Sequence, residues 1–155
     1  MDDNKTKYQN GAKSKGTVLS ILKQLSESGT LRHCSSDYRC GYPGKTEKQF
    51  YAPFFIEFND GYCWILFPSN SIRTDRMNIQ QWNAEHIKRI NKNVTKAYII
   101  VPDEIVNNDK ELKIAEQYDE RLRSGDYYTA IDGVIFQKQI EDLCLGYSSK
   151  GQVTE

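Results

Sequence analysis

The chain contains no apolar run close to the ~20 residues that a membrane-spanning helix needs, and its first residues lack the hydrophobic core of a signal peptide. It has only two histidines, and it shows neither a P-loop nor a dinucleotide-binding fingerprint. Cys34 and Cys40 lie near His33, but their spacing and the lack of a second pair match a zinc site poorly, so free thiols are expected. These absences predict a cytoplasmic protein without membrane contact, and they argue against nucleotide-binding enzymes and histidine-based triads.

A net charge is also absent, since Lys and Arg together number 21 and Asp and Glu together number 21. A domain that binds nucleic acid through general attraction to phosphate is usually clearly basic, so the neutral total does not support that class. It is compatible with a DNA enzyme, because carboxylates that hold a metal ion offset a local basic patch. The 27% charged and 38% hydrophobic residues are typical of an ordinary globular domain.

The length of 155 residues predicts one domain with its own core. We expect a flexible arm over residues 1–14, a single nuclease-like α/β domain over 15–145 and a polar tail over 146–155. Apolar spacing predicts helices over 15–28, 78–90, 109–123 and 137–143, strands over 54–58, 62–67 and 96–101, and a short extended segment within 127–136. Residues 30–46 are expected to form a loop. The order of elements predicts an α/β fold with helices flanking a small mixed β-sheet.

Acidic and basic side chains gather around the first two predicted strands. Glu57 lies near the end of the first strand, and Asp60 occupies the Asn-Asp-Gly turn that follows it. The segment SIRTDR comes after the second strand and brings Ser71, Arg73 and Arg76. Phosphodiester hydrolysis needs carboxylates for Mg²⁺ and cations on the phosphate, and paired arginines near a strand end are a plausible phosphate clamp. An Asp before Gly is equally explained by turn geometry alone.

The next predicted helix carries Gln81, Glu85 and Lys88 on one face, at i, i+4 and i+7 spacing. These side chains are in a position to point at the end of the strands. The alternative interpretation is that Glu85 and Lys88 belong to a solvated helix face. Ile79 and Trp82 are expected on the apolar side of this helix, with Trp82 in the core.

With these features, the chain resembles the PD-(D/E)xK nuclease superfamily and, within it, type II restriction endonucleases. The matching features within about residues 45–102 are an acid at Glu47, the hairpin with Asp60, the SIRTDR loop, the helix QQWNAEHIK and the strand KAYIIVP. The resemblance implies a restriction-endonuclease-like mixed sheet and Mg²⁺-dependent, site-specific hydrolysis of double-stranded DNA. Recognition of a palindromic site also implies a homodimer.

The resemblance implies roles for individual residues. Asp60 and Glu85 are implied as metal ligands with Glu57 in reserve, Arg73 as the group that stabilises the phosphate, and Ser71, Arg76, Gln81, Lys88 and Arg39 as DNA contacts. The chain departs from the family motif because no acid-x-lysine follows Asp60, and Arg73 stands at the lysine position. Arginine holds its proton too strongly to act as a base. A DNA endonuclease, a DNA-binding or regulatory module without catalysis, and a tyrosine-rich protein-interaction domain therefore stay open.

Overall fold

The computed structural model describes residues 2–44, 49–125 and 129–153 of the chain, and side chains within 13–44, 49–125 and 129–149. Its elements are α1 (Asp2–Glu27), β1 (Leu31–Cys40), β2 (Phe50–Phe58), β3 (Cys63–Pro68), α2 (Thr74–Ile90), β4 (Val94–Val101), the 3₁₀ helix η1 (Asp103–Asn107), α3 (Asp109–Ser124), β5 (Gly133–Phe136) and α4 (Gln139–Val153). The strands form one five-stranded sheet in the order β1-β2-β3-β4-β5. The first three strands are antiparallel, and β3, β4 and β5 run parallel. The predicted α/β fold with a mixed sheet is confirmed.

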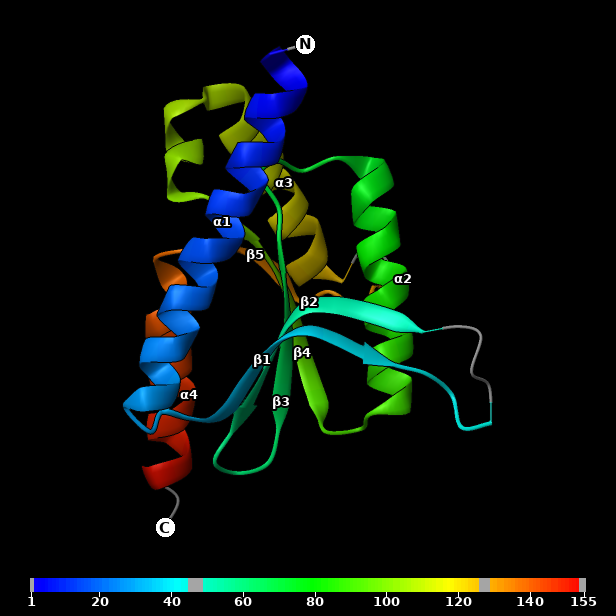
Figure 1. The fold of residues 1–155 in the computed structure, drawn as a ribbon, viewed down its shortest axis with the longest axis vertical. Coiled ribbons are helices and arrows are strands. Elements are labelled where there is room, and N and C mark those ends of the chain that lie inside the picture. The colour runs from blue at the N-terminus through cyan, green and yellow to red at the C-terminus, as the bar shows by residue number, and fades with distance from the viewer. Residues whose placement is uncertain (1, 45–48, 126–128, 154–155) are drawn as a thin grey trace.

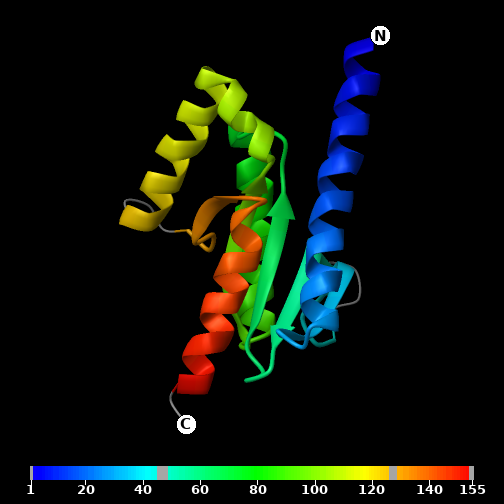
Figure 2. The ribbon, with the colours of Figure 1, turned by 90° about the vertical axis from the view of Figure 1, so that its left-hand side faces the viewer.

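Helices cover both faces of the sheet, and each face has its own hydrophobic core. Alternate residues of the central strands point to opposite faces, so Ile65 and Ile99 pack toward α2 and α3, whereas Leu66 and Ile100 pack toward α1 and α4. Because both faces are buried, β3 and β4 are apolar at nearly every position. Figure 1 shows α1 and α4 on one side of the sheet and α2 on the other. In Figure 2, the N-terminal end of α1 extends well past the sheet.

The direction of the parallel strands defines two ends of the sheet. At the carboxyl end, β3, β4 and β5 finish, α2 begins, and β2 starts because it runs antiparallel to β3. At the amino end lie the β2–β3 turn and the segment that leads into β5. The six residues of β3 separate the two ends by roughly 20 Å.

The predicted strands at 62–67 and 96–101 and the helix at 109–123 are confirmed, whereas the predicted loop at 30–46 was wrong over β1. This strand lies at the edge of the sheet, where polar side chains face solvent and hide the apolar pattern. β2 begins at Phe50 and contains Pro53, which was expected to precede the strand. Pro53 lies opposite Asp37, which departs from strand geometry with a φ of 54°, so no ladder bond needs the missing N–H.

Two terminal helices are longer than predicted. The first begins at Asp2 instead of near residue 15, and the last continues through Val153 instead of ending at 143. Their outer segments lack an apolar repeat, which is the only signal that spacing offers. Of the helices within the described residues, none has the length and apolar character needed to cross a membrane.

The start of α2 was also predicted wrongly. The helix begins at Thr74 after an N-cap at Arg73, so Asn78, where the predicted helix starts, lies inside it. Met77, Ala84 and Ile87 form its buried stripe. Trp82 and Ile79 are 49% and 62% exposed, contrary to the expectation that they face the core.

Candidate functional site

Asp60 is held in the β2–β3 turn at the amino end of the sheet. Its Oδ1 accepts a hydrogen bond from the Tyr62 backbone N–H at 3.0 Å, and its Oδ2 accepts one from the Tyr147 hydroxyl on α4 at 2.6 Å. Burial and this bond raise the pKa of Tyr147 to about 12, so the phenol stays a donor to the carboxylate. These contacts direct Asp60 toward the face that carries α1 and α4.

Glu57 and Glu85 have other partners. Glu57 lies opposite Cys63 at the start of β3 and pairs with Arg32 at 3.2 Å. Glu85 pairs with Arg89 at 2.8 Å, one helical turn further along α2.

Burial, and then the nearby Glu57 and Asp60 carboxylates, raise the pKa of the Cys63 thiol to about 11. The thiolate needed for nucleophilic chemistry is therefore disfavoured.

Lys88 and Gln81 bind parts of the chain that the sequence did not connect to them. Lys88 Nζ donates to Asp132 Oδ2 at 2.9 Å and to the Ala130 carbonyl at 2.6 Å. Gln81 Nε2 donates to the Tyr118 hydroxyl on α3 at 2.6 Å. Lys88 thus reaches the amino end of the sheet, directly before β5, and connects α2 to that segment.

The arginines of the SIRTDR segment lie at the opposite, carboxyl end. Arg73 and Arg76 are exposed at the start of α2, and Arg76 Nη1 donates to the buried Ser69 hydroxyl at 3.3 Å. Ser69 in turn donates to the Ser71 carbonyl at 2.7 Å, which orders the loop. The N-cap residue Arg73 makes no side-chain capping bond, and the first turn of α2 also carries the acidic Asp75. Arg39 is at the same end of the sheet, with its guanidinium 4.8 Å from the centre of the Tyr51 ring.

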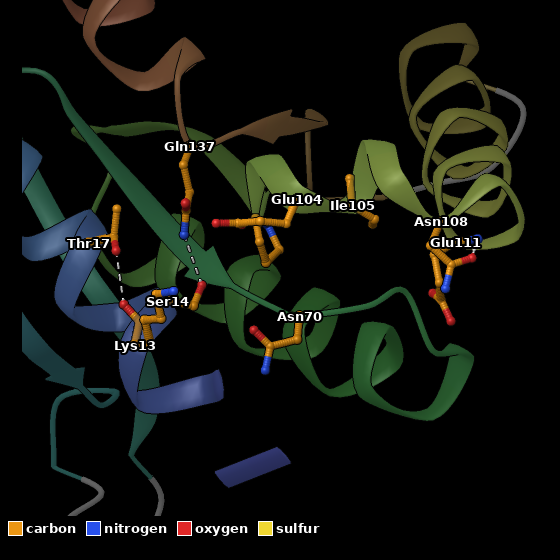
Figure 3. Close-up of a pocket in the computed structure, with 10 residues that line it drawn as sticks. Lys13, Ser14, Thr17, Asn70, Glu104, Ile105, Asn108, Glu111 and Gln137 are labelled. Carbon is orange, nitrogen blue, oxygen red and sulfur yellow. Dashed lines mark hydrogen bonds between the residues drawn. The ribbon is translucent and has the colours of Figure 1, made fainter. Parts of the chain in front are cut away.

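A polar cavity of about 310 Å³ also opens at the carboxyl end (Figure 3). It lies among α1, the loop after β3, η1, the start of α3 and Gln137 after β5. Its lining includes Lys13, Asn70, Glu104, Glu111 and Gln137. Gln137 is almost fully buried and donates through Nε2 to the buried Ser14 hydroxyl at 3.1 Å. Ligands of parallel α/β sheets commonly bind beyond the carboxyl ends of the strands, which makes this end the better-placed site.

Seven of the nine predicted site residues thus form two separate groups, while Gln81 and Glu85 lie along α2 and belong to neither. Ser71, Arg73, Arg76 and Arg39 share the carboxyl end, whereas Glu57, Asp60 and Lys88 share the amino end, a strand length away. Asp60 and Glu85 are further separated because they face opposite sides of the sheet. Within the described part of the chain, no three His, Cys, Asp or Glu side chains come close enough to hold one metal ion. Glu47 lies outside the described residues.

Several well-connected residues escaped prediction. Asp132 is the clearest, since it binds Lys88, Lys96 and the Ala97 backbone N–H. In the sequence, Asp132-Gly133 breaks the extended segment within 127–136, and the resemblance extends to this pair only weakly, with no role for Asp132. Ser69 and Gln137 had no sequence signal, because their contacts come from residues distant in the chain.

Replacing Asp60 tests whether its role is more than structural. Asp60→Asn keeps an oxygen for the Tyr62 N–H, so we expect a loss of less than ~1 kcal/mol in unfolding free energy, and Asp60→Ala a loss of about 1 kcal/mol. The measurement is urea unfolding of both variants, with cleavage of DNA assayed beside it. If Asp60→Asn folded normally but lost all cleavage, the predicted metal-ligand role would gain support over the turn role.

The mixed five-stranded sheet with helices on both faces is an α/β fold, consistent with a restriction-endonuclease-like architecture. The chain is 30% identical over 151 residues to the type II restriction enzyme BsuFI of Bacillus subtilis. The match covers 96% of this chain and 37% of that enzyme. No protein-family model and no solved structure matches the chain. The protein is therefore similar, along nearly its whole length, to part of a type II restriction enzyme.

Proposed function

We propose that this protein is a type II restriction-type DNA endonuclease, which hydrolyses phosphodiester bonds of double-stranded DNA at specific sites. The observation that carries the proposal is the 30% identity to a restriction enzyme across 96% of the chain. The architecture supports it, because a mixed sheet with helices on both faces carries exposed arginines at its carboxyl end.

DNA would meet the protein at the carboxyl end of the sheet. Arg73 and Arg76 offer two guanidinium groups, each suited to bidentate contact with phosphate oxygens. The start of α2 adds the positive end of a 17-residue helix, which the Asp75 carboxylate in its first turn offsets in part. Arg39 supplies a further cation at the same end, and Ser71 shapes the loop through its carbonyl. Gln81 and Lys88 are engaged elsewhere and would act on DNA only indirectly.

The resemblance makes Mg²⁺ dependence part of the proposal. However, the three predicted ligands, Glu57, Asp60 and Glu85, are not arranged to hold one shared ion. Glu57 pairs with Arg32, and Glu85 pairs with Arg89. Asp60 faces the side of the sheet that carries α1 and α4, opposite to the side of Glu85.

Cleavage of mixed plasmid and phage DNA by the purified chain, with Mg²⁺, Mn²⁺ or EDTA in parallel, tests the proposal. We expect discrete fragments with Mg²⁺ and intact DNA with EDTA, because the resemblance implies a Mg²⁺-dependent nuclease, in which the ion activates water and stabilises charge on the phosphate. The Arg73→Ala variant serves as a control for contaminating nucleases, since it should cut less at the same protein concentration. Intact DNA under every metal would exclude catalysis by this chain alone.

A second candidate is a DNA-binding or regulatory module on a nuclease-like scaffold. It is favoured by the separation of the predicted acids and by the arginine at the lysine position. Salt-sensitive binding of duplex DNA with no metal requirement and no fragments would select it over the endonuclease. In either case, a palindromic target would require a homodimer, and the mass of the DNA complex measures the number of copies.

A further inference from the structure

Trp82 is the outermost ring of a packed aromatic cluster between α2 and the β1–β2 hairpin. Its ring lies 4.8 Å from Phe50 and 5.1 Å from His86, both in edge-on geometry. His86 stacks on Phe50 at 4.3 Å and is hydrogen-bonded to the Tyr42 hydroxyl at 2.7 Å. These contacts hold the indole from behind, while 49% of Trp82 remains exposed. A rigid, half-open indole on a helix surface offers a flat apolar face for a ligand.

Beside this ring, the surface is hollowed by about 250 Å³. The hollow is lined by Asn78, Gln81, Trp82, Glu85, Thr129 and Ala130. Because the volume lies just below the usual range for drug-sized ligands, about 300–1,000 Å³, it suits one small ring system. The hollow lies on the outer side of α2, away from the cavity at the carboxyl end of the sheet.

The hydrogen-bonding side chains around the hollow are Asn78, Gln81, Glu85 and Thr129, and the Glu85 carboxylate is the acceptor-only group among them. Gln81 donates through Nε2 to Tyr118, and its Oε1 is a further acceptor. Glu85 accepts from Arg89 through Oε1, and a carboxylate has about four lone-pair sites. Asn78 adds an exposed amide. A ligand for this hollow therefore needs an aromatic face and an edge that donates hydrogen bonds.

An apolar protein segment fits these groups poorly, because it would cover the Glu85 carboxylate and the Gln81 oxygen without bonding them. A nucleobase with an exocyclic amine satisfies both requirements. Stacking on aromatic side chains is a general mode of binding unpaired bases, and Glu, Asn and Gln are suited to the amines of cytosine and adenine.

We propose that this hollow binds one unpaired adenine or cytosine base, stacked on Trp82 with its exocyclic amine toward Glu85. The inference rests on the proposed function only in that DNA supplies the base. It assigns α2 a second role, since the start of the helix lies at the proposed phosphate contact and its middle carries the hollow.

Fluorescence quenching provides a direct test, because the chain has two tryptophans and Trp64 is only 5% exposed. Short single-stranded oligo(dA) and oligo(dC) should quench the emission saturably and more strongly than oligo(dT), which lacks an exocyclic amine. By anisotropy of labelled oligo(dA), Trp82→Leu should weaken binding roughly 5- to 150-fold. Tyr62→Leu is the matched control, because Tyr62 is 48% exposed in the β2–β3 turn and should leave binding unchanged. Glu85→Gln should reduce the preference over oligo(dT).

Absence of saturable quenching, or unchanged binding in a folded Trp82→Leu variant, would overturn the proposal. If Trp82→Leu instead converted a dimer into monomers and left oligonucleotide binding intact, the occupant would be a second copy of the chain. Arg73→Ala/Arg76→Ala separates this inference from the proposed function. That variant should bind duplex DNA much more weakly and keep the fluorescence quenching by single-stranded oligonucleotides. If the unsubstituted protein cleaved DNA but showed no quenching, the proposal for the hollow would be wrong while the proposed function would stand.

Discussion

Replacement of both Arg73 and Arg76 by alanine is expected to weaken binding of duplex DNA by about 100-fold at moderate salt. Each arginine is exposed, so neither substitution removes a core contact. A hydrogen bond to a charged group contributes about 1.5–3 kcal/mol, and two such losses at the lower limit correspond to about two powers of ten. The dissociation constant, measured by titration of labelled duplex, checks this result.

The salt dependence of the same titration identifies the contacts as phosphate contacts. Loss of two phosphate contacts should lower the slope of log K against log salt by about 2. Arg73→Lys/Arg76→Lys keeps the charges without the planar fork, so it should retain most of the slope while affinity falls moderately. Unfolding by urea should be nearly unchanged, since Arg76 contributes only the single bond to Ser69. An alanine variant with unchanged affinity and slope would move the DNA contact away from the start of α2.

The central part of the fold could be predicted because buried strands consist mainly of apolar residues, which can be recognised in the sequence. β3 and β4 are covered on both faces, so their apolar runs stand out, and the Asn-Asp-Gly turn marks the hairpin before β3. Asn108 marks the start of α3, where it accepts from the Glu111 N–H at 3.1 Å. β1 could not be predicted in this way, since an edge strand presents polar side chains to solvent.

The candidate site was harder to predict than the fold because proximity in the chain is a poor guide across a strand. Asp60 and Arg73 are thirteen positions apart, but β3 runs between them and places them at opposite ends of the sheet. Arg73 is the N-cap of α2, whereas Glu85 lies about three turns further along that helix. Helical spacing placed Gln81, Glu85 and Lys88 on one face; Gln81 and Glu85 line the hollow, whereas Lys88 binds Ala130 and Asp132. The same spacing predicts Trp82 in the core, which is wrong. The true buried stripe of α2 follows Met77, Ala84 and Ile87, which leaves Trp82 toward solvent.

Asp132→Ala is expected to lower the free energy of unfolding by about 2–3 kcal/mol. Asp132 is bonded to Ala97 of β4 in both directions: its backbone N–H donates to the Ala97 carbonyl at 2.8 Å, and its Oδ2 accepts from the Ala97 N–H at 2.8 Å. The alanine variant leaves a buried N–H without a partner, which costs roughly 1–3 kcal/mol. The pair with Lys88 adds less than ~1 kcal/mol, because the two side chains are 23% and 28% exposed.

Asp132→Asn separates these two contributions. Its amide oxygen still accepts from Ala97, and only the ionic contacts with Lys88 and Lys96 are weakened, so a loss below ~1 kcal/mol is expected. Urea unfolding with an unchanged m-value is the measurement. Equal losses in the two variants would assign the stability to the ion pairs instead of the backbone bond.

Asp132→Ala should also affect ligand binding in the hollow beside Trp82. Lys88 binds both Asp132 and the Ala130 carbonyl, and Ala130 with Thr129 forms the wall that faces α2 across the hollow. If Asp132 keeps this wall in place, Asp132→Ala should weaken oligo(dA) binding severalfold while Asp132→Asn retains most of it. Binding that is unchanged in a destabilised Asp132→Ala variant would show that the α2 face alone holds the base, with Trp82 as its main contact.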